Sequence, residues 1–297
     1  MFSSIPYVPI TTISHPGIPE KDWDLLRLDK IHPIVSGNKL FKLRPWIDQA
    51  KAQGKTGILT FGGAWSNHIV ASAYASREAG LSSVGMIRGG EFTTTTMAEA
   101  RSYGMVLQNI DRATYRQARE DQFQSMGSSH PGCLVVPEGG YGLPGARGAA
   151  DILRASETKA YTHIICACGT GTMLAGLIGS AAPGQICMGI SIVRQGQHQL
   201  DESIRSLISA GPYPHWTTLH DHDLGGYAKH NRHLIAFMNK FHEEHGVPSD
   251  IVYTGKLFLA METLTSSGFF PMGSKLLAIH SGGLQGNRSL TKGELAF

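Results

Sequence analysis

The sequence predicts an α/β protein built on a parallel, doubly wound sheet, and two observations lead to this prediction. Short apolar segments alternate with longer amphipathic segments along most of the chain, which is typical of parallel strands connected by helices. Five expected strand ends are followed by glycine clusters, and in such sheets ligands bind at the carboxyl ends of the strands. The sequence therefore predicts a ligand held by backbone amides along one edge of the sheet.

The hydrophobic periodicity places the individual elements. An edge strand is expected at 23–28. Further strands are expected at 57–61, 83–87, 105–107, 133–136, 163–167, 186–193 and 275–279, and a short extended segment at 251–253. Helices are expected at 43–54, 66–78, 97–100, 115–123, 146–155, 173–180, 200–209, 229–245 and 255–265. The glycine clusters at strand ends are 62–63, 139–140, 169–171, 225–226 and 282–283, of which the fourth follows a segment with only a weak strand pattern.

Composition excludes several classes of protein. With 297 residues, of which 41% are hydrophobic and 16% charged, the chain can bury a large core as one domain or two. The formal net charge is +3 and no long basic run occurs, so a nucleic-acid partner is not expected. No apolar run is long enough to span a bilayer, and the N-terminus lacks the features of a secretory signal. We therefore expect no membrane partner and a cytoplasmic location.

Cysteine and histidine patterns give no reason to expect a metal. The four cysteines lie in apolar, strand-like stretches, and Cys166-Ala167-Cys168 has no second pair that would complete a zinc set. We interpret them as buried free thiols, which act as small hydrophobes. The runs 220–223 and 242–245 contain two histidines each, but neither has the spacing of a known metal motif, and both are interpreted as polar surface.

A lysine follows a Gly-Asn pair at Gly37-Asn38-Lys39, and a second lysine, Lys42, comes three residues later. One interpretation is that Lys39 is the amine that holds an aldehyde cofactor, with the rest of the chain built around that cofactor. The alternative is a surface lysine in a turn. Periodicity and composition do not decide between the two, so the decision depends on the other motifs.

The clearest anion site is the turn after the expected strand 163–167. It contains Gly169, Thr170, Gly171 and Thr172 and leads directly into a helix. Glycines let backbone N–H groups converge, threonines add hydroxyl donors, and a helix N-terminus favours negative charge. The turn is neither a Walker A loop nor a spaced dinucleotide loop, so a single phosphate fits it best. The alternative is a strand-to-helix turn that binds no ligand.

Two further groups of candidate residues lie near glycines. Trp65, Ser66, Asn67 and His68 open the helix after 62–63; Ser66 is a good N-cap, and the free N–H groups of the first turn could bind a carboxylate. The tyrosines Tyr227 and Tyr253 are the candidate acid–base residues beside Lys39. The alternative for each tyrosine is ordinary half-buried packing.

Taken together, these motifs resemble one family. The chain resembles the pyridoxal-phosphate enzymes of the tryptophan-synthase β-like fold (fold type II), specifically the aminocyclopropane-carboxylate deaminase and D-cysteine desulfhydrase family. The matching segments occur in the family's order at 37–43, 62–68, 137–140, 169–172, 253–256 and 280–283. The separation of the two tyrosines is also similar to that of the family.

The resemblance implies a role for each motif. Lys39 would hold the aldehyde of pyridoxal 5′-phosphate and later act as the base that moves the α-proton. Lys42 and the loop 169–172 would bind the phosphate, and Asn67 would contact the phenolic oxygen. The residues implied at the substrate are Trp65, Ser66, Asn67, His68, Tyr227 and Tyr253.

The resemblance also implies the organisation of the chain. The larger, cofactor-binding domain would comprise residues 1–51 and 151–297, and a smaller α/β domain would comprise the inserted residues 52–150. A homodimer is expected on the same ground.

Two departures from the family pattern affect the choice of reaction. Thr254 stands where the deaminases have an acidic residue near the pyridine nitrogen, so that Thr254 or Ser281 would offer only a neutral hydrogen bond. A weaker electron sink suits β-elimination better than opening a cyclopropane ring. Trp65 and Phe41 replace polar residues of the family and are expected to reshape the substrate pocket.

We therefore expect a pyridoxal-phosphate lyase that acts on a small amino acid, most like a D-cysteine desulfhydrase that forms pyruvate, sulfide and ammonia. The alternative enzyme is a 1-aminocyclopropane-1-carboxylate deaminase that forms 2-oxobutyrate and ammonia. An alternative of another class is a non-catalytic protein that binds pyridoxal phosphate or another phosphate ligand.

Overall fold

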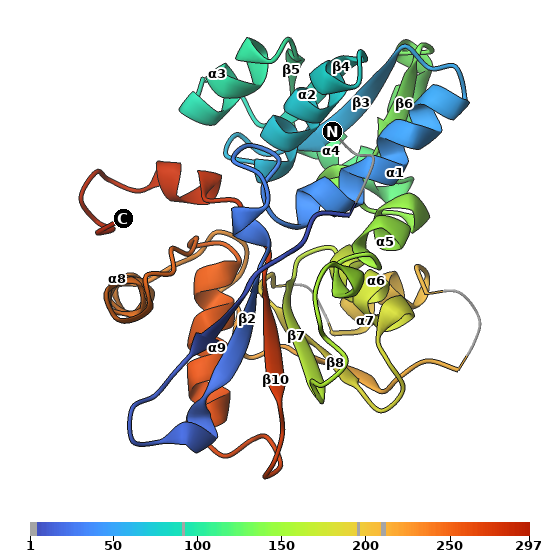
Figure 1. Ribbon diagram of the computed structural model, residues 1–297. Coiled ribbons are helices and arrows are strands. Elements are labelled where there is room, and N and C mark those ends of the chain that lie inside the picture. The colour runs from blue at the N-terminus through green and yellow to red at the C-terminus, as the bar shows by residue number, and fades with distance from the viewer. Residues whose placement is uncertain (1–4, 91–92, 195–196, 209–211) are drawn as a thin grey trace.

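A computed structural model describes residues 5–90, 93–194, 197–208 and 212–297 of the chain. Within these residues the strands form two sheets, a six-stranded sheet of order β1-β2-β10-β7-β8-β9 and a four-stranded sheet of order β5-β4-β3-β6. Figure 1 shows the smaller sheet above the larger one, with helices on both sides of each. The α/β class and the parallel sheets expected from the sequence are thus confirmed.

The larger sheet is formed by two strands near the N-terminus and four strands from the second half of the chain. Its strands are β1 (Ile10–Ile13), β2 (Trp23–Arg27), β7 (His163–Cys168), β8 (Ile186–Ser191), β9 (Trp216–Leu219) and β10 (Leu276–His280). All neighbours run parallel except β1 and β2, which are antiparallel. The expectation of an edge strand at 23–28 is wrong, because β1 pairs with the outer side of β2 and itself forms the edge.

The smaller sheet is entirely parallel. Its strands are β3 (Gly57–Gly62), β4 (Ser82–Arg88), β5 (Val106–Ile110) and β6 (Cys133–Val136), and its helices are α2 (Asn67–Glu78), α3 (Thr95–Ser102) and α4 (Arg112–Glu120). This sheet lies within the range that the sequence assigned to the inserted domain. The division into a larger domain of residues 1–51 and 151–297 and an inserted domain of residues 52–150 stays a prediction.

The other helices are α1 (Asn38–Ala52), α5 (Leu143–Ala149), α6 (Thr172–Ser180), α7 (Gln197–Arg205), α8 (Arg232–His245) and α9 (Thr254–Ser266). Two expected helices differ clearly. Helix α1 begins five residues earlier than expected, and the expected helix 146–155 is split into α5 and a 3-10 turn at Leu153–Ala155. Residue 209, expected at the end of a helix, lies outside the described residues.

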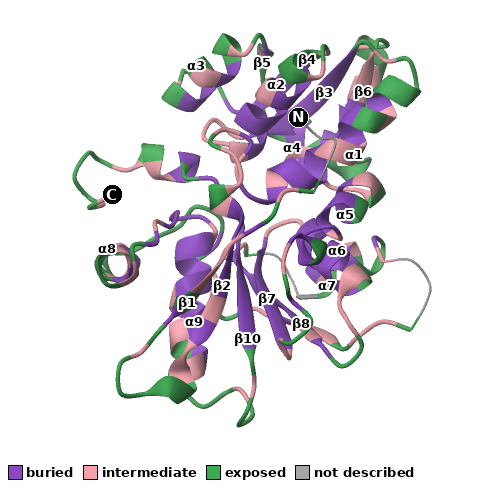
Figure 2. Cartoon of the chain, in the orientation of Figure 1, coloured by how far each residue is buried: buried purple, intermediate pink, exposed green. Residues whose placement is uncertain are grey.

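Both faces of the larger sheet are buried, which explains its nearly continuous apolar strands. Along β7, Ile164 and Cys166 face the core beneath α1, α5 and α6, whereas Ile165 and Ala167 face the core beneath α8 and α9. Figure 2 shows the buried strands of this sheet in purple. All four cysteines are free, and those of β7 and β8 are packed as apolar side chains. No helix in the described residues is long and apolar enough to cross a membrane.

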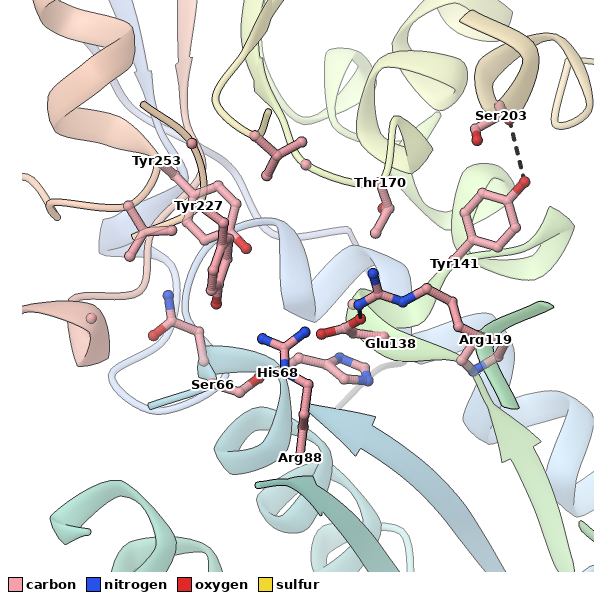
Figure 3. Close-up of a pocket in the computed structure, with 18 of the residues that line it drawn as sticks. Ser66, His68, Arg88, Arg119, Glu138, Tyr141, Thr170, Ser203, Tyr227 and Tyr253 are labelled. Carbon is pink, nitrogen blue, oxygen red and sulfur yellow. Dashed lines mark hydrogen bonds and ion pairs between the residues drawn. The ribbon is translucent and has the colours of Figure 1, made fainter. Parts of the chain in front are cut away.

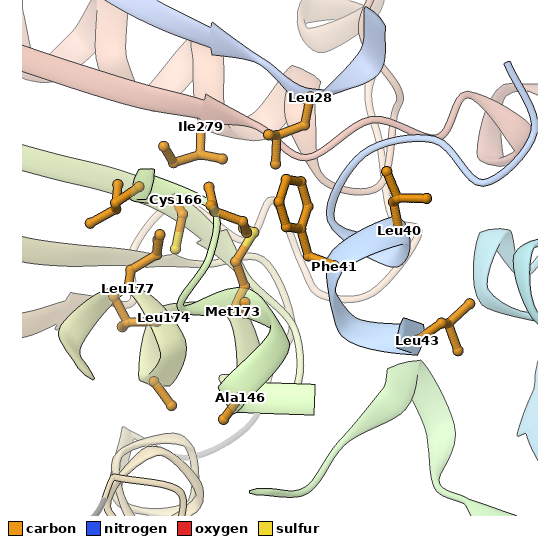
Figure 4. Packing of buried hydrophobic residues seen from close by; sticks show 14 of the residues in the cluster. Leu28, Leu40, Phe41, Leu43, Ala146, Cys166, Met173, Leu174, Leu177 and Ile279 are labelled. Atoms are coloured by element: carbon orange, nitrogen blue, oxygen red, sulfur yellow. The ribbon is translucent and has the colours of Figure 1, made fainter. Parts of the chain in front are cut away.

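Helix α1 packs unusually closely on α5, and this contact fixes the position of Lys39. A Cβ atom added at Gly148 would lie 2.1 Å from the carbonyl oxygen of Phe41, so only glycine allows this approach. The Phe41 ring is 2% exposed and packs in the core with Leu28 and Met173 (Figure 4). The expectation that Phe41 shapes the substrate pocket is therefore wrong, because its side of α1 faces the larger sheet.

Candidate active site

Two cavities adjoin where the carboxyl ends of both sheets face each other, and Lys39 lines both. The larger cavity has a volume of about 680 Å³ and is lined by Trp65, Ser66, His68, Tyr227 and Tyr253, among others. The smaller one, of about 50 Å³, is lined by Lys42, Ser281 and the loop 169–172. Asn67 lines both cavities. The structure thus brings together nearly all of the residues that the sequence motifs indicated.

Lys39 lies in the first turn of α1. Gly37, just before this helix, lets the turn pack against the end of β10. Gly37 has φ +69°, and a Cβ atom there would lie 1.7 Å from the carbonyl oxygen of Ser281. The next residue, Asn38, donates its backbone N–H to the same oxygen at 3.0 Å. Because of this close approach, Lys39 points into the cavities, where its Nζ donates to Oδ1 of Asn38 at 2.8 Å.

The surroundings of Lys39 make its amine easier to deprotonate. Burial lowers the pKa of Lys39 from 10.5 to about 8, although the negative charge of Asp250 raises it in part. A lysine with a lowered pKa carries a larger neutral fraction, and the neutral amine is the nucleophile and the base. The position is therefore suited to an amine that reacts with an aldehyde.

The smaller cavity has the chemistry of a phosphate site. Gly171, with φ +76°, precedes α6, and the hydroxyls of Thr170 and Thr172 lie 2.8 Å apart at the start of this helix. Beside them the ammonium of Lys42 is buried, and no described residue forms a hydrogen bond or ion pair with it. Burial, and then the charge of Lys39, lowers the pKa of Lys42. A bound anion would favour its charged form.

The N-terminus of α2 provides the second set of donors. Ser66 is the N-cap, and its Oγ accepts from the N–H of Ile69 at 3.4 Å, so its own hydrogen is free to donate. Asn67 donates to the carbonyl of Gly283 at 3.0 Å, while its Oδ1 is buried and has no partner among the described residues. His68 is held by Thr60 at 2.8 Å, and burial keeps its pKa low, so the imidazole is neutral.

The two tyrosines stand together on the opposite wall. The ring centroids of Tyr227 and Tyr253 are 6.4 Å apart and the rings are nearly perpendicular. Burial, followed by the neighbouring Tyr227, raises the pKa of Tyr253 well above its usual value, so its hydroxyl stays protonated. Figure 3 shows both hydroxyls directed into the larger cavity. This arrangement allows hydrogen bonding to a substrate.

The structure places Thr254 away from both cavities, unlike the sequence-based expectation. Its hydroxyl donates to Oδ1 of Asp250 at 2.8 Å and accepts from the N–H of Asp250 at 2.7 Å. The segment expected to be extended at 251–253 is instead a turn capped by the Asp250 carboxylate, which accepts from the N–H groups of Val252 and Tyr253. Ser281 is the hydroxyl that lines the smaller cavity.

Sequence reasoning assigned no role to several charged residues: three that line the larger cavity, and Lys256, which lines neither cavity. Arg88 ends β4, and Glu138, which forms an ion pair with Arg119, follows β6; all three line the larger cavity. Lys256 is 1% exposed and its Nζ donates to the carbonyls of Asp223 at 2.6 Å and Gly226 at 2.7 Å. A charged residue at the carboxyl end of an apolar parallel strand was the available signal for Arg88 and Glu138.

The residues present fit pyridoxal phosphate. Three features line the same small cavity: an amine with a lowered pKa, an anion loop beside the buried amine of Lys42, and Oδ1 of Asn67. Neither the Lys42 amine nor the Asn67 Oδ1 has a partner within the described part of the chain. Such buried polar groups without partners are costly unless a ligand satisfies them. The phosphate, the aldehyde and the ring oxygen of this cofactor supply the matching groups.

Comparisons with known proteins agree with this geometry, although no family model matches the chain. A Pyrococcus horikoshii protein provisionally named a 1-aminocyclopropane-1-carboxylate deaminase is 27% identical over 274 residues, which cover 85% of this chain and 81% of the relative. The Arabidopsis thaliana bifunctional D-cysteine desulfhydrase/1-aminocyclopropane-1-carboxylate deaminase is 25% identical, over 94% of this chain and 76% of that protein.

Solved structures show the same relationship. A crystal structure of an ACC deaminase homologue superposes with a TM-score of 0.80 at 25% identity and covers 95% of this chain and 91% of its own. A fungal L-serine ammonia-lyase from Rhizomucor miehei, at 15% identity and a TM-score of 0.66 over 93% of each chain, shares the fold. The chain therefore belongs to the pyridoxal-phosphate enzymes with the type II fold, and among them it is similar over most of its length to 1-aminocyclopropane-1-carboxylate deaminases and a D-cysteine desulfhydrase.

Proposed function

We propose that this protein removes ammonia and a β-leaving group from a small amino acid, as a D-cysteine desulfhydrase does. The observation that carries the choice is the lining of the smaller cavity, where the described residues include no aspartate or glutamate and Ser281 offers a neutral hydroxyl. A cofactor ring without an acidic partner is a weaker electron sink. Such a ring supports loss of a good leaving group better than opening of an unactivated ring.

Each residue of the site has a proposed role. Lys39 holds the cofactor aldehyde, while Lys42 and the loop 169–172 hold its phosphate. When bound, pyridoxal phosphate supplies the electron sink that stabilises negative charge at the α-carbon. The substrate carboxylate is held by the hydroxyl of Ser66 and the N–H groups at the start of α2.

Proton transfer is assigned to Lys39 and the two tyrosines. The amine of Lys39, with its pKa of about 8, is close to the range in which a general base is effective at neutral pH. Tyr253 packs against the phosphate loop, since a Cβ atom on Gly169 would lie 3.3 Å from its ring. It thereby covers the cofactor side of the cavity and presents its protonated hydroxyl to the substrate, with Tyr227 beside it.

A 1-aminocyclopropane-1-carboxylate deaminase is the second candidate, and the names of several relatives favour it. A substrate panel separates the two: both enantiomers of cysteine and serine, β-chloro-D-alanine and the cyclopropane acid, each assayed for release of the oxoacid. We expect pyruvate from D-cysteine and β-chloro-D-alanine. Turnover of the cyclopropane acid alone would show that the second candidate is correct.

The cofactor assignment has a simple optical test. Purified protein with added pyridoxal phosphate should absorb in the visible range, and Lys39→Ala should abolish this band. Lys240→Ala is the matched control, since its side chain is 72% exposed on α8. A wild type without such a band would contradict the role of Lys39. We further propose a homodimer, on the ground of family resemblance, and a cytoplasmic location, on the ground of the sequence pattern.

A further inference from the structure

We propose that the substrate carries a second anionic group on its side chain and that Arg88 binds this group. The proposal rests on the function proposed above and specifies the class of amino acid that the site accepts. Three observations support the proposal. Arg88 lies at the cavity, it has no carboxylate partner in the described part of the chain, and other residues provide donors for the α-carboxylate.

Arg88 is placed at the cavity by the smaller sheet. It is the last residue of β4, which runs parallel to β3, so that its carboxyl end lies beside Gly62 and Gly63. A Cβ atom on Gly63 would lie 3.8 Å from Nη2 of Arg88, and the guanidinium carbon is 5.3 Å from the ring centroid of Tyr115. The open space over Gly63 and the contact with the Tyr115 ring together hold the guanidinium of Arg88 in one orientation. Figure 3 shows the guanidinium directed into the cavity.

The charge of Arg88 is not neutralised within the described residues. Arg119, on the same cavity wall, forms an ion pair with Glu138, and Arg194 lies 3.9 Å from Asp223. No carboxylate of the described chain is within ion-pair distance of Arg88, which is only partly exposed. A half-buried guanidinium without a counter-ion is suited to bidentate binding of a carboxylate, phosphate or sulfonate.

The α-carboxylate does not need this arginine. Ser66 and the start of α2 already present a hydroxyl and free N–H groups next to Lys39. Arg88 belongs to β4 and not to α2, and it faces a cavity of about 680 Å³, which is within the usual size of a ligand site. The site therefore has two separate positions for anions on the substrate side, one on α2 and one on β4.

O-Phosphoserine is a suitable probe, because it differs from serine by one anionic group. In its β-elimination the α-proton is transferred to the base, the Cβ–O bond breaks, and phosphate leaves with the electron pair of that bond. Overall, O-phosphoserine and water give pyruvate, ammonia and inorganic phosphate. Pyruvate release is measured for both enantiomers of O-phosphoserine and serine and for β-chloroalanine, with wild type, Arg88→Met and Arg88→Lys holoenzymes.

We expect the wild type to have a lower KM for one enantiomer of O-phosphoserine than for the neutral amino acids. Loss of a charge-assisted contact in Arg88→Met should raise that KM about 10- to 100-fold, and Arg88→Lys should restore part of the loss. The neutral substrates should change about twofold or less. Arg77→Met is the matched control, because Arg77 also lies over tyrosine rings, at 4.9 Å from two of them, but outside the cavity.

A binding measurement keeps this test separate from that of the proposed function. Calorimetry of the holoenzyme with 2-amino-3-phosphonopropionate and with alanine reports the preference without any elimination. One outcome is that no oxoacid forms, that the wild type binds the phosphonate more tightly than alanine, and that Arg88→Met loses this difference in affinity. In that case the proposed reaction is wrong and the anion site is supported. Equal weakening of all substrates in Arg88→Met, or an unchanged phosphonate affinity, would overturn the proposal.

Discussion

The most direct test of the site is the titration of Lys39. Its burial lowers the pKa from 10.5 to about 8, which can be measured in the apoprotein through the reactivity of the neutral amine. At pH 7 a pKa of about 8 leaves about one lysine in ten neutral, whereas a pKa of 10.5 leaves about one in three thousand. Near neutral pH Lys39 should therefore react about 300-fold more often than the same amine in the unfolded chain.

Trace acetylation followed by peptide mass spectrometry measures this difference. The labelling rate of Lys39 should increase about tenfold per pH unit below pH 8 and level off above it, with exposed Lys240 labelled in the same sample as the reference. In urea the early plateau should disappear. A rate for Lys39 in the folded protein that still increases steeply at about pH 10 would refute a lowered pKa. Asp250→Asn should move the midpoint further down, because the charge of Asp250 favours the protonated amine.

Two further substitutions test the residues that position the tyrosines. In Lys256→Met the carbonyls of Asp223 and Gly226 lose their buried donor. We expect the free energy of unfolding in urea to fall by about 2–4 kcal/mol. We also expect kcat to fall about tenfold or more, while the absorbance band of the bound cofactor is retained. Loss of that band would show that Lys256 supports the whole site. Asp250→Asn removes the carboxylate that accepts from buried N–H groups of the Tyr253 turn. The free energy of unfolding should again fall by about 2–4 kcal/mol. Unchanged unfolding in urea would show that the turn is stable without this carboxylate.

The sequence predicted the elements well wherever both faces of an element are buried. The apolar run of β7 and the small residues of α6 occupy positions that nearly any packing of this chain would bury. The expected strand 133–136 matches β6 at both ends. Errors occurred at segment ends and edges, as at β2 and α5, because pairing with β1 and the crossing with α1 depend on residues far away in the chain.

For the site, the sequence by itself determined the chemical inventory: the Gly-Asn-Lys segment, the phosphate loop, the Ser-Asn start of α2 and the two tyrosines. Local patterns encode these features, since turns and helix starts need particular residues at neighbouring positions. Only the tertiary structure decided how side chains are used. It paired the hydroxyl of Thr254 with Asp250, buried Phe41 in the core and left Arg88 without a counter-ion in the described cavity. Orientation and pairing depend on neighbours brought together by folding, and a sequence pattern does not record them.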